Sequence, residues 1–188
     1  MGRWEPNARG RLEQAALELF VERGFEQTTV AEIAQRAGLT ERTFFRHFAD
    51  KREVLFAGGS ALKELLVNAV AQAPDDVAPL DAVAVALQAA APHLQQRGDY
   101  PMQRQAVIAA NPELQERELI KLAGLATAMA AALRDRGVPE PTASLAAEAG
   151  IAVFRVAFER WTSEDCRPDL AMLMRDSLDQ LKAVTATR

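Results

Sequence analysis

The sequence has little of what builds disulfide scaffolds or zinc sites. Its 188 residues include one cysteine, Cys166, and two histidines, His47 and His93, which lie far apart. A single thiol excludes an internal disulfide and fits a reducing compartment. A structural zinc site needs four ligands, most often cysteine and histidine. We therefore expect no metal and no cofactor, and a redox role for Cys166 is an open alternative that nothing else in the sequence supports.

The sequence also lacks long uninterrupted apolar runs. No run approaches the roughly 18 apolar residues that a membrane span needs. Residues 1–10 carry charges and no apolar segment, so they do not resemble a secretory signal. We therefore expect a cytoplasmic protein that does not enter a membrane.

What the sequence does contain favours helices. It has 37 alanines, and alanine is the best helix former and a poor strand former. Apolar residues make up 49% and charged residues 26%, which is typical of a soluble globular protein. No segment alternates apolar and polar residues as a strand does, and no internal repeat is visible. The prediction is an all-α fold.

The charges are unevenly distributed. The net charge is −4, but residues 1–56 hold equal numbers of basic and acidic side chains. Within them, residues 36–52 form a basic island, in which only Glu41 and Asp50 are acidic. A local excess of positive charge in an acidic protein suggests an anionic partner. The basic members of the island are Arg36, Arg42, Arg46, Lys51 and Arg52.

The first 56 residues follow the order of a helix-turn-helix module. Apolar side chains at helical spacing predict a helix over residues 9–23 that ends at Gly24. Thr29 and Glu32 form a capping box for a second helix, which stops at Gly38. Thr40 then caps a third helix over residues 41–48. Two short helices joined by a tight glycine turn are typical of helix-turn-helix proteins.

The rest of the chain is expected to form a helical bundle. We expect Asp50 to cap a fourth helix that continues through Ala69, with Gly58 and Gly59 inside it. The glycine pair is a hinge in one hypothesis and a site of close helix packing in the other. Prolines then mark the ends of further helices over residues 80–91, 103–110, 113–136, 142–161 and 169–183. The domains are thus predicted as 1–56 and 57–188, with about nine helices in total.

The third helix has two opposite faces. At about 100° per residue, Phe44 and Phe48 lie on one face, and Arg42 and Arg46 lie on the other. Two arginines four residues apart can bind guanine or phosphate. The alternative is an ordinary solvated charged face.

Residues 9–55 resemble the DNA-binding domain of the tetracycline-repressor (TetR) family of bacterial regulators. The resemblance implies an all-helical homodimer that binds near-palindromic operator DNA, usually to repress. One departure is Phe45, where the family most often has a tyrosine that bonds phosphate; phenylalanine can contact a thymine methyl group or the sugar instead. The matching segments are Ala16–Phe20, Gly24-Phe25, Thr28–Ala34, Ala37–Leu39, Thr43–Phe48 and Asp50-Lys51.

The resemblance implies DNA contacts by the third helix and by both residues at the start of the second. It also implies that Lys51 holds phosphate. For His47, packing within the domain is an alternative, and for residues 3–9 a minor-groove arm and a frayed terminus are both open. The implied DNA-binding residues are Thr28, Thr29, Arg42, Thr43, Phe45, Arg46, His47 and Lys51.

Specific binding in a genome needs more base pairs than one module contacts, so two copies related by a two-fold axis are expected. Apolar stripes on the last two helices suit the interface between subunits, and burial within one chain is the alternative. The candidates are Ala149, Val153, Val156, Ala157, Trp161, Leu170, Leu173, Met174, Leu178 and Leu181.

The middle helices, residues 78–136, are expected to sense a small apolar or amphipathic effector. Residues 104–161 resemble, more weakly, the domains of family members that sense acyl-coenzyme A-like ligands. Core filling or surface exposure is the alternative for each candidate residue. The candidates are His93, Met102, Gln103, Arg104, Met129, Phe154 and Phe158.

Two other functions are alternatives to a DNA-binding regulator. A helical enzyme needs a nucleophile, a base and an orienting group within reach, and the sequence contains no nucleophile elbow, phosphate-binding loop or metalloprotease motif. A helical protein-interaction module that no longer reads DNA is the second alternative. DNA binding distinguishes the regulator from both.

Overall fold

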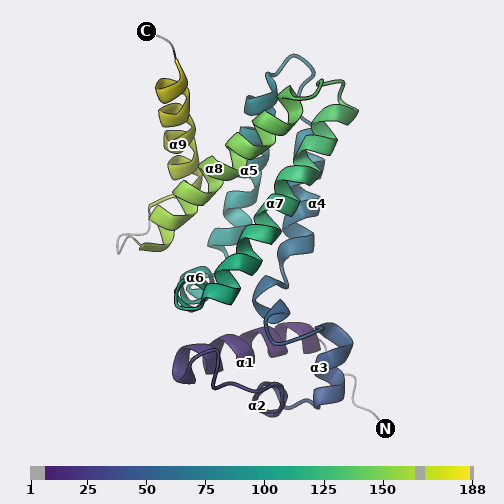
Figure 1. The fold of residues 1–188 in the computed structure, drawn as a ribbon, viewed down its shortest axis with the longest axis vertical. Helices are drawn as coiled ribbons and strands as arrows, with labels where there is room; N and C mark the ends of the chain where they lie inside the picture. Colours follow the sequence, from purple (N-terminus) through teal and green to yellow (C-terminus); the bar gives the residue numbers. More distant parts are fainter. Residues whose placement is uncertain (1–6, 164–167, 187–188) are drawn as a thin grey trace. The chain divides into compact units, whose positions relative to one another are not determined.

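The computed structural model describes residues 7–163 and 168–186 (Figure 1). Cys166 and residues 3–6 of the segment considered as a minor-groove arm lie outside these residues, whereas Asn7 caps α1 and Arg9 lies in its first turn. The described part contains nine α-helices and one 3-10 helix and no strand, which confirms the all-α prediction. The helices are α1 (Ala8–Arg23), α2 (Val30–Arg36), α3 (Glu41–His47), η1 (Glu53–Phe56, 3-10), α4 (Gly59–Ala71), α5 (Pro79–Gln95), α6 (Tyr100–Ala109), α7 (Pro112–Asp135), α8 (Thr142–Ser163) and α9 (Leu170–Thr185).

The chain forms two compact units. The first unit contains residues up to 58 together with 102–118, and the second contains 59–101 and the residues from 119 onward. The sequence predicts that residues 102–118 belong to the second domain, whereas in the structure they pack with the N-terminal residues. Helix α7 carries residues of both units, so helix boundaries read from the sequence could not reveal this grouping.

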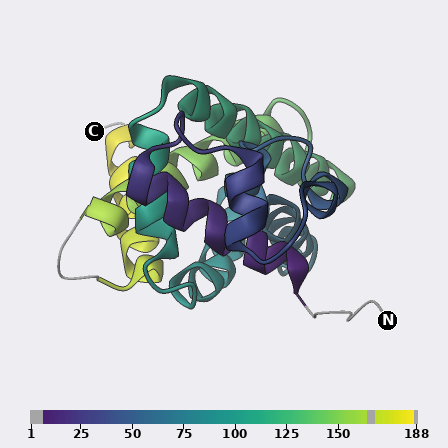
Figure 2. The same cartoon turned by 90° about the horizontal axis from the view of Figure 1, so that it is seen from below.

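Helices α1 to α3, purple to dark blue in Figures 1 and 2, form as predicted because each start is capped by a side chain. Asn7 accepts a hydrogen bond from the Gly10 amide, and Thr40 accepts one from the Thr43 amide. Both hydrogen bonds of the capping box at Thr29 are present. Gly24 and Gly38 end α1 and α2 with positive φ angles of 88° and 65°, which glycine adopts without steric cost.

The prediction of one continuous fourth helix from Asp50 to Ala69 was wrong. The chain forms η1, turns at Ala57 and Gly58, and begins α4 at Gly59. The Ala57 carbonyl accepts a hydrogen bond of 2.7 Å from Arg9. The two glycines also disfavour a continuous helix by about 1 kcal/mol each relative to alanine.

Two prolines do not lie where the sequence placed the helix ends. Helix α5 was expected to stop at Ala91 but runs through Pro92 to Gln95. Proline removes one backbone hydrogen bond there, while Leu94 beyond it still packs against the core. Helix α6 begins at Tyr100 rather than 103, with Pro101 in its first turn, where the missing N–H has no helical partner to lose.

Among the described residues, one stretch, Glu53–Ala71, is long and apolar enough to cross a membrane by length and composition, with a mean hydropathy of 1.4. The stretch is not an uninterrupted apolar run, since it contains Lys63 and Glu64. The stretch is broken after η1, and Leu66 and Val70 lie in the core of the second unit. Length and composition are therefore weak grounds for a membrane span here.

The core of the second unit is built from α4, α5, α8 and α9, with residues of α7. Helices α5 and α8 approach closely at Gly150. A Cβ atom on Gly150 would lie 2.2 Å from Cγ1 of Val83, which is itself fully buried. The close approach of α5 and α8 therefore requires glycine, which has no side chain, at position 150.

We expect Gly150→Ala to lower the free energy of unfolding by about 1–3 kcal/mol, because overpacking outweighs the gain in helix propensity. Gly124→Ala is the matched control, since nothing lies within 4 Å of a Cβ at that position on α7. The control should raise stability by up to about 1 kcal/mol. Urea denaturation measures both. Equal stabilisation by the two substitutions would contradict close packing at the α5–α8 crossing.

Candidate nucleic-acid interface

Helix α3 presents the two faces that its sequence predicts. Phe44 and Phe48 are 0% and 4% exposed, and their ring centroids lie 5.4 Å apart in the core of the first unit. Arg42 and Arg46 are exposed on the other side of the helix. Phe45 is 56% exposed, and its ring meets the edge of Phe44 at 5.5 Å. The buried rings therefore fix which side of α3 faces solvent.

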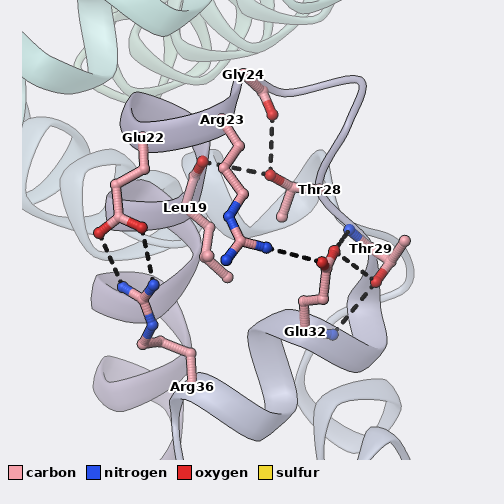
Figure 3. A network of polar contacts seen from close by, with 8 residues as sticks. All are labelled: Leu19, Glu22, Arg23, Gly24, Thr28, Thr29, Glu32 and Arg36. Carbon is pink, nitrogen blue, oxygen red and sulfur yellow. Dashed lines mark hydrogen bonds and ion pairs between the residues drawn. The ribbon is translucent and has the colours of Figure 1, made fainter.

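The cations of the basic island differ in how they are used, and Arg36 is fully engaged. Its guanidinium donates to both carboxylate oxygens of Glu22, at 3.0 and 2.8 Å (Figure 3). It also donates to Glu18 at 3.3 Å. The hydrogen bond from Arg36 holds the pKa of Glu22 below its usual value. Arg36 thus joins α2 to α1 and has no charge left over for an anion.

Arg52 is engaged in the same way. It donates to Asp50 at 2.8 Å, and this bond lowers the pKa of the Asp50 carboxyl. The other Asp50 oxygen accepts hydrogen bonds from the amides of Arg52 and Glu53, at 2.8 and 3.1 Å. Asp50 therefore caps the chain where η1 begins, as the sequence predicted, although the element is a 3-10 helix.

Arg42 and Arg46 are different. Neither forms a hydrogen bond or an ion pair with any residue that the structure describes, and both are exposed. Their spacing of four residues places both guanidiniums on the same side of α3. Within the basic island they are the two positive charges available to a negatively charged partner.

Thr29, at the start of α2, lies on the surface. Its hydroxyl accepts a hydrogen bond from the Glu32 amide, and the Glu32 carboxylate accepts one from the Thr29 amide (Figure 3). That backbone hydrogen bond is the largest cause of the lowered pKa of Glu32. Arg23 adds an ion pair to Glu32 at 2.9 Å. The capping box thereby ties the end of α1 to the beginning of α2.

Thr28 is not on the exposed side. Its side chain is 1% exposed, and its hydroxyl donates to the carbonyls of Gly24, at 2.9 Å, and Leu19, at 3.4 Å (Figure 3). The structure therefore does not bring Thr28 to the face that carries Arg42 and Arg46. The sequence signal for the buried, turn-forming role of Thr28 is its position four residues after Gly24, the glycine that ends α1.

Lys51 is also turned inward. Its ammonium donates to the carbonyls of Phe25, Thr28 and Glu26 at 2.8, 3.2 and 3.4 Å. It lies 4.3 Å from the centroid of the Phe25 ring. Because the partners are 23–26 residues away in sequence, no local pattern could identify them.

Thr43 and His47 lie on the flanks of α3 and are half-buried. The Thr43 hydroxyl lies 3.0 Å from that of Thr40, within hydrogen-bond distance. The Nε2 atom of His47 is buried and has no hydrogen-bond partner among the described residues. Of the predicted DNA-binding residues, Arg42, Phe45, Arg46 and Thr29 are thus the exposed ones.

The effector candidates are scattered over both units. Met129 and Phe154 are buried in the core of the second unit, where Phe154 stacks on Phe158 at 5.4 Å. His93 and Gln103 are exposed, and Met102 is half-buried. None of them lines the shallow apolar depression of the second unit, which has no room for a water molecule and whose walls are Leu80, Ala84, Leu87, Gln88, Gly150, Val153, Met174 and Leu178.

Arg104 is the remaining effector candidate, and its contacts lie within the first unit. Its guanidinium donates to the Leu55 carbonyl of η1 at 2.7 Å and to Glu118 at 2.8 Å. It also lies 5.0 Å from the Phe56 ring centroid. A second arginine, Arg117, pairs with Glu53 at the start of η1. Helices α6 and α7 thus hold η1 through two guanidiniums.

Most of the dimer candidates are covered within a single chain. Val156 is 45% exposed, whereas Leu181 is partly buried against the core. The remaining candidates have little surface left to offer a second subunit, so their role in dimerisation stays a prediction. Ala149 is half-buried, and the buried ones are Val153, Ala157, Trp161, Leu170, Leu173, Met174 and Leu178.

Two family models match the chain. Residues 13–57 match bacterial regulatory proteins of the tetR family, and residues 77–186 match the MftR C-terminal domain. The curated relatives include TcmR of Streptomyces glaucescens, an HTH-type transcriptional regulator, with 43% identity over 43% of this chain and 36% of TcmR. They also include MftR of Mycobacterium tuberculosis, with 28% identity over 66% of this chain and 63% of MftR.

These matches span less than two thirds of the length of either relative. Among solved structures, the TetR-family repressor FadR of Thermus thermophilus, in complex with lauroyl-CoA, aligns over 96% of both chains with 25% identity and a TM-score of 0.58. The second family model alone covers more than half of the sequence, and the first covers the helix-turn-helix module. The chain therefore belongs to the TetR family of bacterial regulatory proteins.

Proposed function

We propose that the protein is a cytoplasmic, dimeric DNA-binding transcriptional regulator, and that as a repressor it leaves its operator when it binds a small amphipathic effector. The observation that carries the proposal is the state of Arg42 and Arg46. They are exposed, unpaired within the described structure, and fixed outward by the burial of Phe44 and Phe48. An unpaired pair of guanidiniums on a short helix suits the major groove.

On this proposal, α3 is the reading helix. The guanidiniums bind guanine edges or phosphates, and the exposed Phe45 ring contacts a thymine methyl group or a sugar. Arg36 and Arg52 contribute little to binding because their charges are already paired with carboxylates. The free positive charge of the basic island lies on α3, which allows an acidic chain to present a local cationic surface to DNA.

The dimer is proposed to form through exposed apolar side chains of α8 and α9. Leu145 and Val156 on α8 are 67% and 45% exposed, and Met172 on α9 is 52% exposed. With Ala152, which is also exposed, Leu145 and Val156 follow a helical repeat of seven and four residues. A two-fold axis brings the same stripe of each subunit together and repeats α3 at two half-sites.

The effector is proposed to be an acyl-coenzyme A. Its support is the FadR structure with lauroyl-CoA, which is 25% identical to this chain and aligns over 96% of both chains. An effector that prefers a conformation with altered α3 spacing lowers operator affinity by its differential binding energy. Within the first unit, Arg104 and Arg117 hold η1, so a movement of α6 or α7 alters the segment that precedes Gly58 and Gly59.

Arg42→Ala and Arg46→Ala should each weaken binding to the promoter DNA beside the encoding gene by about 5- to 150-fold, since a bidentate guanine contact contributes about 1–3 kcal/mol. Fluorescence anisotropy at fixed salt measures this. Arg36→Ala is the control and should change affinity less than about twofold. A wild-type protein that binds this DNA no better than unrelated DNA would reject the proposal and favour a protein-interaction module.

Val156→Glu should convert the dimer into a monomer, because it places a carboxylate against its symmetry mate in an apolar interface. Sedimentation velocity measures the change. Leu119→Glu is the matched control, since Leu119 is 55% exposed on α7 and lies outside the proposed interface. A dimer that survives Val156→Glu, or a monomeric wild-type protein, would contradict the proposed interface.

Lauroyl-CoA should release the bound promoter DNA in a concentration-dependent manner and raise the melting temperature of the free protein, because a ligand that binds the folded state stabilises it. Coenzyme A and lauric acid, each alone, are the controls and should do neither at the same concentration. If lauroyl-CoA changes neither DNA binding nor melting temperature, acyl-coenzyme A is not the effector.

A further inference from the structure

Among the cations of the basic island, Lys51 has the surroundings that differ most from those of a side chain that binds a DNA phosphate. Its side chain is half-buried, and its ammonium faces the turn between α1 and α2. Three backbone carbonyls, those of Phe25, Glu26 and Thr28, accept its hydrogen bonds. An ammonium group has three N–H donors. All three are used within the protein, and none remains for a phosphate oxygen.

The position of the ammonium is favourable for electrostatic reasons. Helix α1 ends at Arg23, and carbonyl groups beyond a helix C-terminus have no helical N–H partners. A cation near this end interacts favourably with the negative end of the helix dipole. The face of the Phe25 ring, 4.3 Å away, adds a cation–π contact. Moving the ammonium to a DNA phosphate would break these interactions together.

The same turn determines where α2 begins. The Thr28 amide donates to the Phe25 carbonyl at 3.3 Å, so Lys51 and Thr28 share that acceptor. The Thr28 hydroxyl binds the Gly24 carbonyl at 2.9 Å, which fixes the other side of the turn. The next residue, Thr29, caps α2, and α2 packs against α3. The hydrogen bonds of Lys51 thus support the geometry on which the placement of α3 rests.

We propose that Lys51 is a positioning residue for DNA binding, which acts by holding the 25–28 turn and makes no phosphate contact of its own. This inference rests on the proposed DNA-binding function and revises the role that the family resemblance implied for Lys51. The phosphate contact is the competing account, and the two differ in the salt dependence of binding. Loss of one phosphate contact lowers the slope of log K against log salt concentration by about 0.9, whereas loss of positioning does not change the number of released ions.

The test compares promoter affinity across a series of salt concentrations for the wild-type protein, Lys51→Met and Lys51→Arg. Lys51→Met should lower affinity roughly tenfold at every salt concentration, because the stem remains while the charged donors are lost. Its salt slope should equal that of the wild type. A slope lower by about 0.9 would overturn the proposal, since it would show that Lys51 contacts a phosphate.

Lys51→Arg sharpens the comparison. A guanidinium keeps the charge and binds phosphate well, so a phosphate contact would be rescued. The planar fork cannot direct three donors at three converging carbonyls as a compact ammonium does. We therefore expect Lys51→Arg to bind about as weakly as Lys51→Met. Wild-type affinity in Lys51→Arg would overturn the proposal.

Two further measurements separate positioning from general stability. Affinities are measured under conditions in which circular dichroism shows each variant to be fully folded. If Lys51 contributes only to the stability of the protein, the folded variants bind DNA with wild-type affinity, and this result would reject the proposal. Amide exchange of Thr28 and Thr29 should quicken in Lys51→Met, while that of α9 should not change. If the wild-type protein binds no DNA, the proposed function and the positioning role both fail. If the amide exchange of Thr28 and Thr29 is unchanged in Lys51→Met, only the proposal that Lys51 holds the 25–28 turn is rejected.

Discussion

The burial of Phe44 and Phe48 behind α3 is the interaction on which the rest of the candidate site depends. The two rings lie in the core of the first unit and fix the rotation of a helix only seven residues long. Because the helix turns by about 100° per residue, this rotation places Arg42 and Arg46 in solvent. A short helix has little stability of its own, so its orientation comes from tertiary packing. The proposed reading of DNA follows from this anchoring.

The second constraint is that the carbonyl groups at and beyond the end of α1 need hydrogen-bond donors. Thr28 and Lys51 donate hydrogen bonds to five carbonyls between Leu19 and Thr28, and a buried or half-buried carbonyl without such a donor would be costly. Both residues belong to the segments that resemble the family's DNA-binding domain. Their side chains nevertheless form hydrogen bonds within the first unit. The free positive charge of the basic island is therefore concentrated on α3.

The first unit also contains residues from α6 and the beginning of α7. Arg104 and Arg117 reach η1 from these helices, and Arg9 reaches the Ala57 carbonyl from α1. Two guanidiniums therefore hold η1, and a third holds Ala57, which lies between η1 and two glycines. A segment held by several long side chains responds to the movement of any helix that carries them. This arrangement gives the proposed effector response a physical route.

The sequence by itself determined the features that local interactions create. Helix starts at Thr29 and Thr40, stops at Gly24 and Gly38, and the two faces of α3 follow from capping and from the helical period, which act within four residues. Only the tertiary structure decided which cations are free, because Lys51 meets Phe25 across 26 residues and Arg117 meets Glu53 across 64. It also decided that Pro92 lies inside α5 and that η1 interrupts the fourth helix. Such outcomes depend on which distant groups compete for the same donor, acceptor or apolar surface, and the order of residues along the chain does not encode that competition in any local pattern.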